Sequence, residues 1–453
     1  MKEISVKEAA EAVGGKLCNG GDSAMINGVT MDSRLVKAGN LFVAIKGERV
    51  DGHDFIGQVF EKKASAVLCE RVPEGVTGPC IVVENTLKAL QTLAAYYRKL
   101  LDVRVVGVTG SVGKTSTKEI IAAVLSAKFS VLKTAGNYNN EIGLPLTVLS
   151  IEPSHEIAVL EMGISDFGEM RLLTSIACPD YCVITNIGQS HLENLGTRDG
   201  IYRAKSEIFE SMNPEGAIFL NGDDDILCTK KEISGIKPVF FGFGDKNDYR
   251  PDNIVPLGLK GTEFDVVSPH GAFPVKTGLF GSHMVGNALA AAAVGHTLGM
   301  TDAEITEGLK DASTIAGRLN LIPFGDGFII DDCYNAAPSS MKAAIDTLAL
   351  ASGRRVAVLG DMFELGTDSD NMHAEIGEYA ADSTIEKLIC IGENSRHMVE
   401  GARNANTGVQ IHYFPTVDSF LAEKDYLIAK GDNVLVKASH GMNFVRIVEA
   451  LKA

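Results

Sequence analysis

The chain of 453 residues contains no tryptophan and no C-x-x-C pair among its eight cysteines. The cysteines lack the spacing of a metal site, so we expect reduced, buried thiols. Basic residues number 42 against 58 acidic ones, and the formal net charge of −16 argues against a nucleic-acid surface. An apolar run of about 18 residues is absent, which argues against a membrane span. We therefore expect a soluble, cytoplasmic protein, and we predict no nucleic-acid partner.

Short apolar strands alternate with helical segments through most of the chain, and 45% of the residues are hydrophobic. This alternation predicts an α/β protein with parallel sheets covered on both faces. The N-terminus, MKEISVKEAAEAVGG, has the pattern of an amphipathic helix and not of a signal peptide. A new set of strands begins at Gly317 and indicates a further α/β unit, so we place boundaries near residues 84 and 316. We predict three domains, at 1–84, 85–316 and 317–453, with short antiparallel strands at about 245–281.

A glycine-rich stretch, VVGVTGSVGKTSTKE, follows a β-branched strand and opens a helix near Lys114. It departs from G-x-x-x-x-G-K-[ST], because Val108 occupies the first glycine position. Gly110 and Gly113 permit backbone conformations that form an anion cradle. Lys114 can then reach phosphates and the Thr115 hydroxyl can bind Mg²⁺. A glycine turn with a solvated lysine is the alternative, which the matching strand and helix disfavour.

Three polar residues follow the next strands of this predicted sheet. Glu161 ends the strand in EIAVLEMG at the sheet edge where a parallel sheet places its ligands, so it suits Mg²⁺ or is a strand-end glutamate that faces solvent. His191 follows YCVITNIG and could be a general base, a metal ligand or neither. Lys205 lies in IYRAKSEIFE, where composition favours an exposed helical lysine with ion-pair neighbours. Taken alone, none of the three decides the chemistry.

Three residues later in the chain have side chains that could contact a nucleotide. Asn287, in GSHMVGNALAAA, could read a base edge or cap the start of a helix. Arg318, in TIAGRLN, suits a phosphate or is a linker arginine. Asp332, in IIDDCYNAAP, suits a ribose hydroxyl or is a turn residue before Pro338.

Together these segments resemble the Mur ligase family. The motifs that carry the resemblance, in order, are TGSVGKTSTKE, NYNNEIGLPLT, EMG, NIGQSHLE, AKSEIF, GRLN, DDCYNAAPSSM and VLGDMFELG. The resemblance extends from MDSRLVKAGNLFVAIKGERVDGHDF to NVLVKASHGMNF, which is essentially the whole chain. It implies a small N-terminal α/β substrate domain, a central P-loop ATPase domain with a parallel sheet, and a C-terminal Rossmann-like domain.

The resemblance also implies the ligands of particular residues. ATP would be bound by the loop, by Asn287 at adenine, by Arg318 at the γ-phosphate and by Asp332 at ribose. Two Mg²⁺ sites would use Thr115, Glu161, His191 and Lys205, with Lys205 carrying a carbamate. The catalytic residues would be Lys114, His191, Lys205 and Arg318. The loop residues are Thr109, Gly110, Ser111, Val112, Gly113, Lys114, Thr115 and Ser116.

The implied reaction is ATP-dependent amide formation through an acyl phosphate, in peptidoglycan synthesis. Within the family, the motifs favour the activity that joins D-alanyl-D-alanine to UDP-N-acetylmuramoyl-tripeptide. A monomer is the family-based expectation. The residues predicted to contact substrate are Ser33, Arg34, Lys46, Asp51, His53, Asn137 and Asn335.

Three positions depart from the usual family pattern, namely Met31, Ala337 and His440. The last two place the detailed dipeptide contacts in question, but not the reaction. One alternative is the preceding ligase, which adds the third amino acid, although its D-N-P-R motif is absent. Another is a non-catalytic ATP-binding P-loop protein. A GTPase is disfavoured because N-K-x-D is absent.

Overall fold

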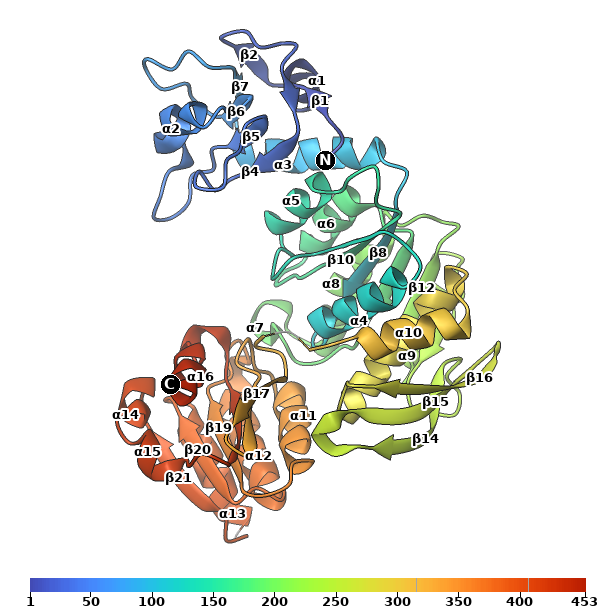
Figure 1. Cartoon of the computed structure of the whole chain (residues 1–453), viewed down its shortest axis with the longest axis vertical. Coiled ribbons are helices and arrows are strands. Elements are labelled where there is room, and N and C mark those ends of the chain that lie inside the picture. The colour runs from blue at the N-terminus through green and yellow to red at the C-terminus, as the bar shows by residue number, and fades with distance from the viewer. Residues whose placement is uncertain (315, 406) are drawn as a thin grey trace.

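The computed structural model describes residues 1–314, 316–405 and 407–453. It arranges the chain as three α/β units that follow one another along the longest axis (Figure 1). The unit with the glycine loop lies in the middle, between the N-terminal and C-terminal units. The predicted fold class is therefore confirmed. No helix in the described part of the chain has the length and apolar character needed to cross a membrane.

The N-terminal unit contains a five-stranded sheet with the order β2-β7-β6-β5-β4. All neighbouring pairs are parallel except β2 and β7. The predicted N-terminal helix is shorter than expected, because β1 (Ile4–Ser5) pairs with β3 (Met25–Ile26) and α1 (Val6–Ala12) begins after it. The remaining elements are β2 (Lys16–Cys18), β4 (Gly28–Thr30), β5 (Asn40–Val43), α2 (Ile56–Glu61), β6 (Ala66–Cys69) and β7 (Cys80–Val82).

The central unit is built on a six-stranded, fully parallel sheet with the order β13-β12-β11-β8-β10-β9. Alternate residues of β8 enter two different cores, which shows that both faces of the sheet are covered. One core holds α4, α9 and α10, and the other holds α3, α5 and α6. The strands are β8 (Arg104–Thr109), β9 (Val131–Lys133), β10 (Ile157–Glu161), β11 (Tyr181–Ile184), β12 (Ala217–Asn221) and β13 (Val239–Phe241).

The helices of this unit follow the strands in the predicted alternation. They are α3 (Thr86–Lys99), α4 (Lys114–Ser126), α5 (Gly143–Leu149), α6 (Glu169–Ala177), α7 (Leu192–Leu195), α8 (Arg198–Ser206), α9 (Ser282–Thr297) and α10 (Asp302–Asp311). The predicted antiparallel segment is a three-stranded sheet of β14 (Arg250–Pro256), β15 (Thr262–Ser268) and β16 (Gly271–Thr277). It packs against α9, whose buried face is rich in alanine.

The C-terminal unit has the sheet order β17-β18-β22-β19-β20-β21, in which β17 alone is antiparallel to its neighbour. The strands are β17 (Asn320–Phe324), β18 (Gly327–Asp331), β19 (Arg355–Gly360), β20 (Lys387–Ile391), β21 (Gln410–Phe414) and β22 (Asn433–Lys437). The helices are α11 (Pro338–Ala349), α12 (Ser369–Asp382), α13 (Ser395–Ala405), α14 (Val417–Leu421), α15 (Lys424–Leu427) and α16 (Val445–Lys452). The predicted boundary at 316 adjoins residue 315, which lies outside the described residues.

Six edge strands of the three larger sheets escaped the sequence analysis, namely β2, β4, β9, β13, β17 and β21. Edge strands are short or contain exposed residues, because one side of each has no neighbour. β9 and β13 have three residues each, β17 contains Pro323, and β21 exposes Gln410. The central strands were predictable because burial on both faces requires a continuous apolar run.

Candidate active site

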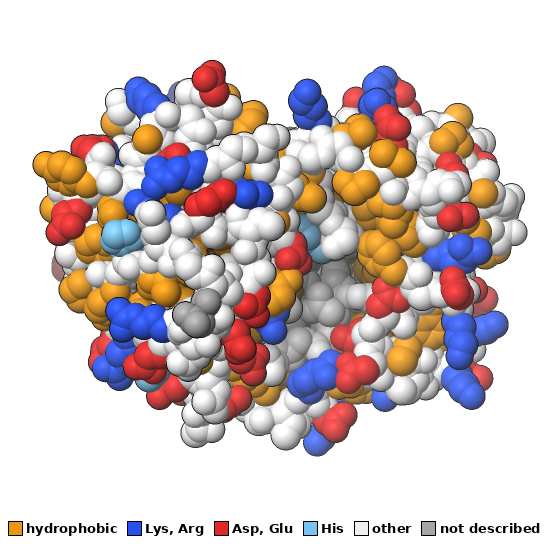
Figure 2. Space-filling view, turned by 90° about the horizontal axis from the view of Figure 1, so that it is seen from below, with side chains coloured by type: hydrophobic (Ala, Val, Ile, Leu, Met, Phe, Trp, Pro, Cys, Tyr) orange, Lys and Arg blue, Asp and Glu red, His pale blue; other side chains and the backbone are white. Residues whose placement is uncertain are grey.

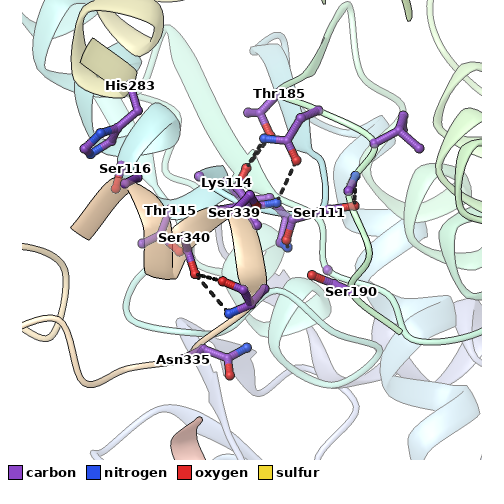
Figure 3. Close-up of a pocket in the computed structure, with 18 of the residues that line it drawn as sticks. Ser111, Lys114, Thr115, Ser116, Thr185, Ser190, His283, Asn335, Ser339 and Ser340 are labelled. Carbon is purple, nitrogen blue, oxygen red and sulfur yellow. Dashed lines mark hydrogen bonds between the residues drawn. The ribbon is translucent and has the colours of Figure 1, made fainter. Parts of the chain in front are cut away.

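A cavity of about 880 Å³ lies between the central and C-terminal units. The surface is visibly hollowed between two lobes when it is seen from below (Figure 2). Figure 3 draws Lys114 and Thr115 of the loop with Ser339 and Ser340 of α11, and all four line this cavity. The predicted residues that line it are Ser111, Val112, Gly113, Lys114, Thr115, Ser116, Glu161, His191, Asn287, Arg318, Asp332 and Asn335.

The glycine loop depends on two backbone conformations that side chains disfavour. Gly110 has φ of 146° and Gly113 has φ of 83°. A Cβ atom at Gly110 would lie 2.0 Å from the Thr185 hydroxyl, so the loop is packed directly against β11. Lys114 folds back on the loop and donates to the Gly110 carbonyl at 2.8 Å. Burial is the main cause that lowers the Lys114 pKa, and Arg318 lowers it further.

Asn186, which follows β11, holds the middle of the loop. The Ser111 amide donates to the Asn186 carbonyl at 3.0 Å, and the Val112 amide donates to the Asn186 side chain at 3.0 Å. These two amides are therefore already engaged. An anion would therefore be bound mainly by the backbone N–H groups in the first turn of α4, which have no intrahelical partner. The sequence analysis missed Asn186, although its position directly after a strand of the sheet could have indicated it.

Glu161 ends β10 and is 1% exposed. Its Oε1 accepts from Thr115 at 3.1 Å and from Asn139 at 2.8 Å. Its backbone amide donates to Thr134 at 2.9 Å. Within the part of the chain that the structure describes, Oε2 has no hydrogen-bond partner. A fixed carboxylate with one unpaired oxygen beside a threonine hydroxyl is the donor set that a hard cation such as Mg²⁺ takes.

Lys205 lies in α8 and is fully buried, so the exposed-lysine interpretation is wrong. Its Nζ has no hydrogen-bond partner among the described residues. Burial, together with the nearby charge of Lys114, lowers the Lys205 pKa well below its usual range. A buried amine without a partner is costly unless another group satisfies it. The predicted carbamate would supply oxygen atoms at this position.

The described residues contain no group of three or more His, Cys, Asp and Glu side chains that could hold a metal ion. Metal binding here would therefore require other oxygen donors. Thr115, a modified Lys205 and nucleotide phosphates are such donors. The unpaired Oε2 of Glu161 and the unpaired Nζ of Lys205 fit a metal site that is completed by such oxygen donors.

His191 lies at the start of α7 and lines the cavity. Its Nδ1 is 2.6 Å from Oε2 of Glu364, which belongs to the C-terminal unit. The sequence analysis did not identify Glu364, since the two residues are far apart in the chain. The structure thus gives the imidazole a carboxylate partner on one side.

Arg318 spans the junction between the two units. Its guanidinium donates to the Thr115 hydroxyl at 3.1 Å and lies 4.0 Å from the centre of the Tyr334 ring. Stacking on an aromatic face orients a guanidinium without using its N–H donors. The loop and Arg318 therefore already lie close together, as a shared phosphate would require.

Asp332 follows β18 and is buried. Its Oδ2 accepts from Lys437 at 2.6 Å, and its Oδ1 accepts from the Leu319 amide at 3.1 Å. The turn interpretation is therefore incomplete, since the side chain links β18 to the segment before β17 and to β22. A ribose contact by Asp332 stays a prediction.

Asn287 was predicted to stand at the start of a helix, and this placement is wrong. The helix begins at Ser282, so Asn287 lies in its second turn, where its side chain accepts from Thr117 at 3.0 Å. It still lines the cavity. His283, one turn earlier, lines the cavity as well, and burial lowers its pKa. The sequence analysis missed His283, although it stands in the quoted stretch GSHMVGNALAAA.

The predicted substrate residues near 137 and 335 divide between surface and cavity. Asn137 is exposed, whereas Asn139 two residues later lines the cavity and orients Glu161. Asn335 lines the cavity from the C-terminal side. A role for Asn137 as a substrate contact stays a prediction, and the nearby asparagine with observed contacts was missed.

The other predicted substrate residues lie in the N-terminal unit, outside the large cavity. Arg34 lines a second cavity of about 640 Å³ and pairs with Asp32 at 2.7 Å. His53 is buried, with Nδ1 at 2.7 Å from Asp51 and Nε2 accepting from the Glu70 amide at 2.9 Å. Both of its nitrogens are thus engaged in holding the loop.

The three remaining predicted substrate residues, Ser33, Lys46 and Asp51, also make their contacts within the N-terminal unit. Ser33 uses its carbonyl to accept from Lys62 at 2.8 Å. Lys46 forms an isolated antiparallel bridge with Asp51. Arg71 is the main cause that holds the pKa of the Asp51 carboxyl well below its usual range. Substrate contacts by Ser33, Lys46 and Asp51 stay predictions.

Three family models match this chain in order. The Mur ligase family catalytic domain matches residues 25–98, the Mur ligase middle domain matches 108–295, and the Mur ligase glutamate ligase domain matches 317–440. The chain belongs to the Mur ligase family. The loop, Glu161, Lys205 and Arg318 are therefore features of a Mur ligase chain, and the predicted resemblance is confirmed.

Similar proteins and structures cover this Mur ligase chain almost completely. The UDP-N-acetylmuramoyl-tripeptide–D-alanyl-D-alanine ligase of Bacillus subtilis is 41% identical and covers 100% of this chain and 99% of its own. The ligase of the same name from Escherichia coli is 36% identical with the same coverage. A crystal structure of MurF from Acinetobacter baumannii is 32% identical, covers both chains fully and has a TM-score of 0.90. The MurF ligase of Thermotoga maritima, solved with ADP, is 32% identical, covers 94% of this chain and 97% of its own, and has a TM-score of 0.82.

Proposed function

We propose that this chain is an ATP-dependent amide-forming ligase that joins D-alanyl-D-alanine to UDP-N-acetylmuramoyl-tripeptide, a step of peptidoglycan synthesis. Full-length similarity to ligases of that name supports the substrate pair. The observation that carries the proposal is the cavity between two units, where Arg318 of the C-terminal unit donates to Thr115 of the glycine loop.

The proposed reaction has two steps. The terminal carboxylate of the tripeptide attacks the γ-phosphorus of ATP, and ADP leaves. The amine of D-alanyl-D-alanine then attacks the acyl phosphate carbonyl, loses a proton, and phosphate leaves. The chain's contribution is mainly positioning and charge neutralisation.

Particular residues would perform this positioning. Lys114 and Arg318 neutralise phosphate charge from opposite units. Asn287 and Asp332 hold the adenine and ribose ends, and Ser33 and Arg34 hold the UDP end. The substrate reaches from the N-terminal unit to the central cavity, which agrees with the order of the units along the chain.

Mg²⁺ would be held at two sites by Thr115, Glu161, His191 and a carbamate on Lys205. When bound, Mg²⁺ would polarise phosphate oxygens and neutralise their charge. The unpartnered Lys205 amine supports the modification, because a neutral amine is the form that adds CO₂. Domain boundaries near 84 and 316, a monomer and a cytoplasmic location complete the proposal.

Phosphate release with UDP-N-acetylmuramoyl-tripeptide and ATP tests the proposed substrate pair. We expect release with D-alanyl-D-alanine and much less with single amino acids. Release with single amino acids alone would refute it in favour of the preceding ligase. No release with either would favour a non-catalytic ATP-binding protein.

A further inference from the structure

A carboxylate–imidazole contact connects the loop after β11 with the C-terminal unit. Oε2 of Glu364 lies 2.6 Å from Nδ1 of His191. The side chain of His191 is 20% exposed and that of Glu364 is 55% exposed. In Figure 1, α7, which begins directly after His191, lies beside the C-terminal unit. The contact therefore depends on how the two units are oriented.

Glu364 stands in a loop that is fixed to its own unit. The Met362 amide donates to Nε2 of His373 at 2.9 Å, and the Phe363 amide donates to the Ser439 hydroxyl at 2.9 Å. Both acceptors are buried, with His373 0% and Ser439 3% exposed. The backbone before Glu364 therefore moves with the C-terminal unit, and the carboxylate is presented from a rigid base.

His191 is fixed to the central unit in a comparable way. Its carbonyl accepts from the Leu195 amide at 3.0 Å, which closes the turn of α7. The two partners are also alike in their backbones, since His191 has φ of 62° and Glu364 has φ of 63°. Left-handed conformations are costly for residues other than glycine, and they persist where the surroundings determine them, often at functional sites. Each side chain is thus aimed by a strained backbone.

We propose that Glu364 is a positioning residue for His191, and the inference rests on the proposed function of His191 as a metal ligand. The carboxylate accepts the Nδ1–H of His191, which fixes one tautomer and one ring orientation and leaves Nε2 as the nitrogen with a free lone pair. Carboxylates behind ligating histidines have this effect in metal sites. Because Glu364 moves with the C-terminal unit, His191 is held ready when the two units adopt this orientation.

The test compares Glu364→Ala and Glu364→Gln with a matched control, Glu400→Ala. Glu400 forms a similar pair with His397 at 3.1 Å, but within one helix of the C-terminal unit. Nitrogen-15 NMR of the full, histidine-labelled chain reports the tautomer of each ring, and a His191→Asn chain assigns the His191 signal. We expect the Nδ1–H tautomer in the unmodified chain and in Glu364→Gln, and a tautomer mixture in Glu364→Ala.

A second measurement follows Mn²⁺ affinity by electron paramagnetic resonance, with a non-hydrolysable ATP analogue present. We expect Glu364→Ala to weaken Mn²⁺ binding by about tenfold, as for other removed partners of ligating histidines. Glu364→Gln should recover most of the Mn²⁺ affinity. Glu400→Ala should change neither the tautomer of His191 nor the Mn²⁺ affinity. The proposal is overturned if Glu364→Ala matches Glu400→Ala in either measurement. Absent phosphate release from the unmodified chain would instead refute the proposed function.

Discussion

Replacing Lys205 with methionine should make the chain more stable while it abolishes amide synthesis. Lys205 is fully buried, and no described residue forms a hydrogen bond with its Nζ. Methionine is flexible, has nearly the same length and buries no polar group. The stability gain and the activity loss have one cause, because the unsatisfied amine is the group that the proposed carbamate requires.

The size of the stability gain from Lys205→Met follows from the free-energy cost of burying the unsatisfied amine. A buried polar group without a partner costs about 1–3 kcal/mol. Each kcal/mol shifts the melting temperature of a domain of this size by roughly 2–4 °C. We therefore expect Lys205→Met to raise the transition of the central unit by at least about 2 °C in buffer depleted of CO₂.

The gain in stability from Lys205→Met should decrease as the pH rises. Burial lowers the Lys205 pKa well below its usual range, so the folded chain binds fewer protons there than the unfolded chain. Stability of the unmodified chain then rises with pH up to the unfolded pKa of about 10.4. The advantage of Lys205→Met should shrink between about pH 7 and pH 9.

Differential scanning calorimetry of the full chain measures these changes. Lys99→Met, at an exposed position of α3, controls for the substitution itself. Added bicarbonate should stabilise the unmodified chain and leave Lys205→Met unchanged, because binding to the folded state alone shifts stability. A melting temperature for Lys205→Met at or below that of the unmodified chain would refute the reasoning.

Three further substitutions test the cavity. Gly110→Ala should weaken binding of an ATP analogue by more than about tenfold by calorimetric titration, because its Cβ would lie 2.0 Å from the Thr185 hydroxyl. Asn139→Ala should weaken Mn²⁺ binding about fivefold by electron paramagnetic resonance, because the carboxylate at the end of β10 loses a donor worth about 1 kcal/mol. Lys437→Met should lower the unfolding free energy by about 3–5 kcal/mol in urea, because it leaves the buried Asp332 unpaired.

Each of these three predictions has a control variant or a defined outcome that would contradict it. Gly136→Ala also changes a glycine of positive φ, but with nothing within 4 Å of the new Cβ, so it should leave ATP-analogue binding unchanged. Equal Mn²⁺ affinities in Asn139→Ala and in Asn137→Ala would show that Asn139 does not orient the carboxylate. Adding Asp332→Asn to Lys437→Met should restore part of the lost stability, and a further loss would contradict the buried-pair argument.

The sequence predicted the buried strands of the central sheet and the loop that follows β8. It could do so because continuous apolar runs and a glycine–lysine spacing are local features. It also placed Glu161 at a strand end, where the structure finds it with one unpaired oxygen. The interpretation of Asn287 as a cap at the start of its helix was wrong, because the helix begins at Ser282 and Asn287 lies in its second turn.

Contacts between distant segments could not be predicted in this way. The amino-acid sequence alone indicated the α/β class, the family and the candidate residues for phosphate and metal, because those depend on residue type and order. Tertiary structure decided that Lys205 is buried rather than exposed, that Asn186 holds the loop, and that Glu364 meets His191. Each of these depends on which elements pack together, and burial and pairing follow from packing rather than from neighbouring residues.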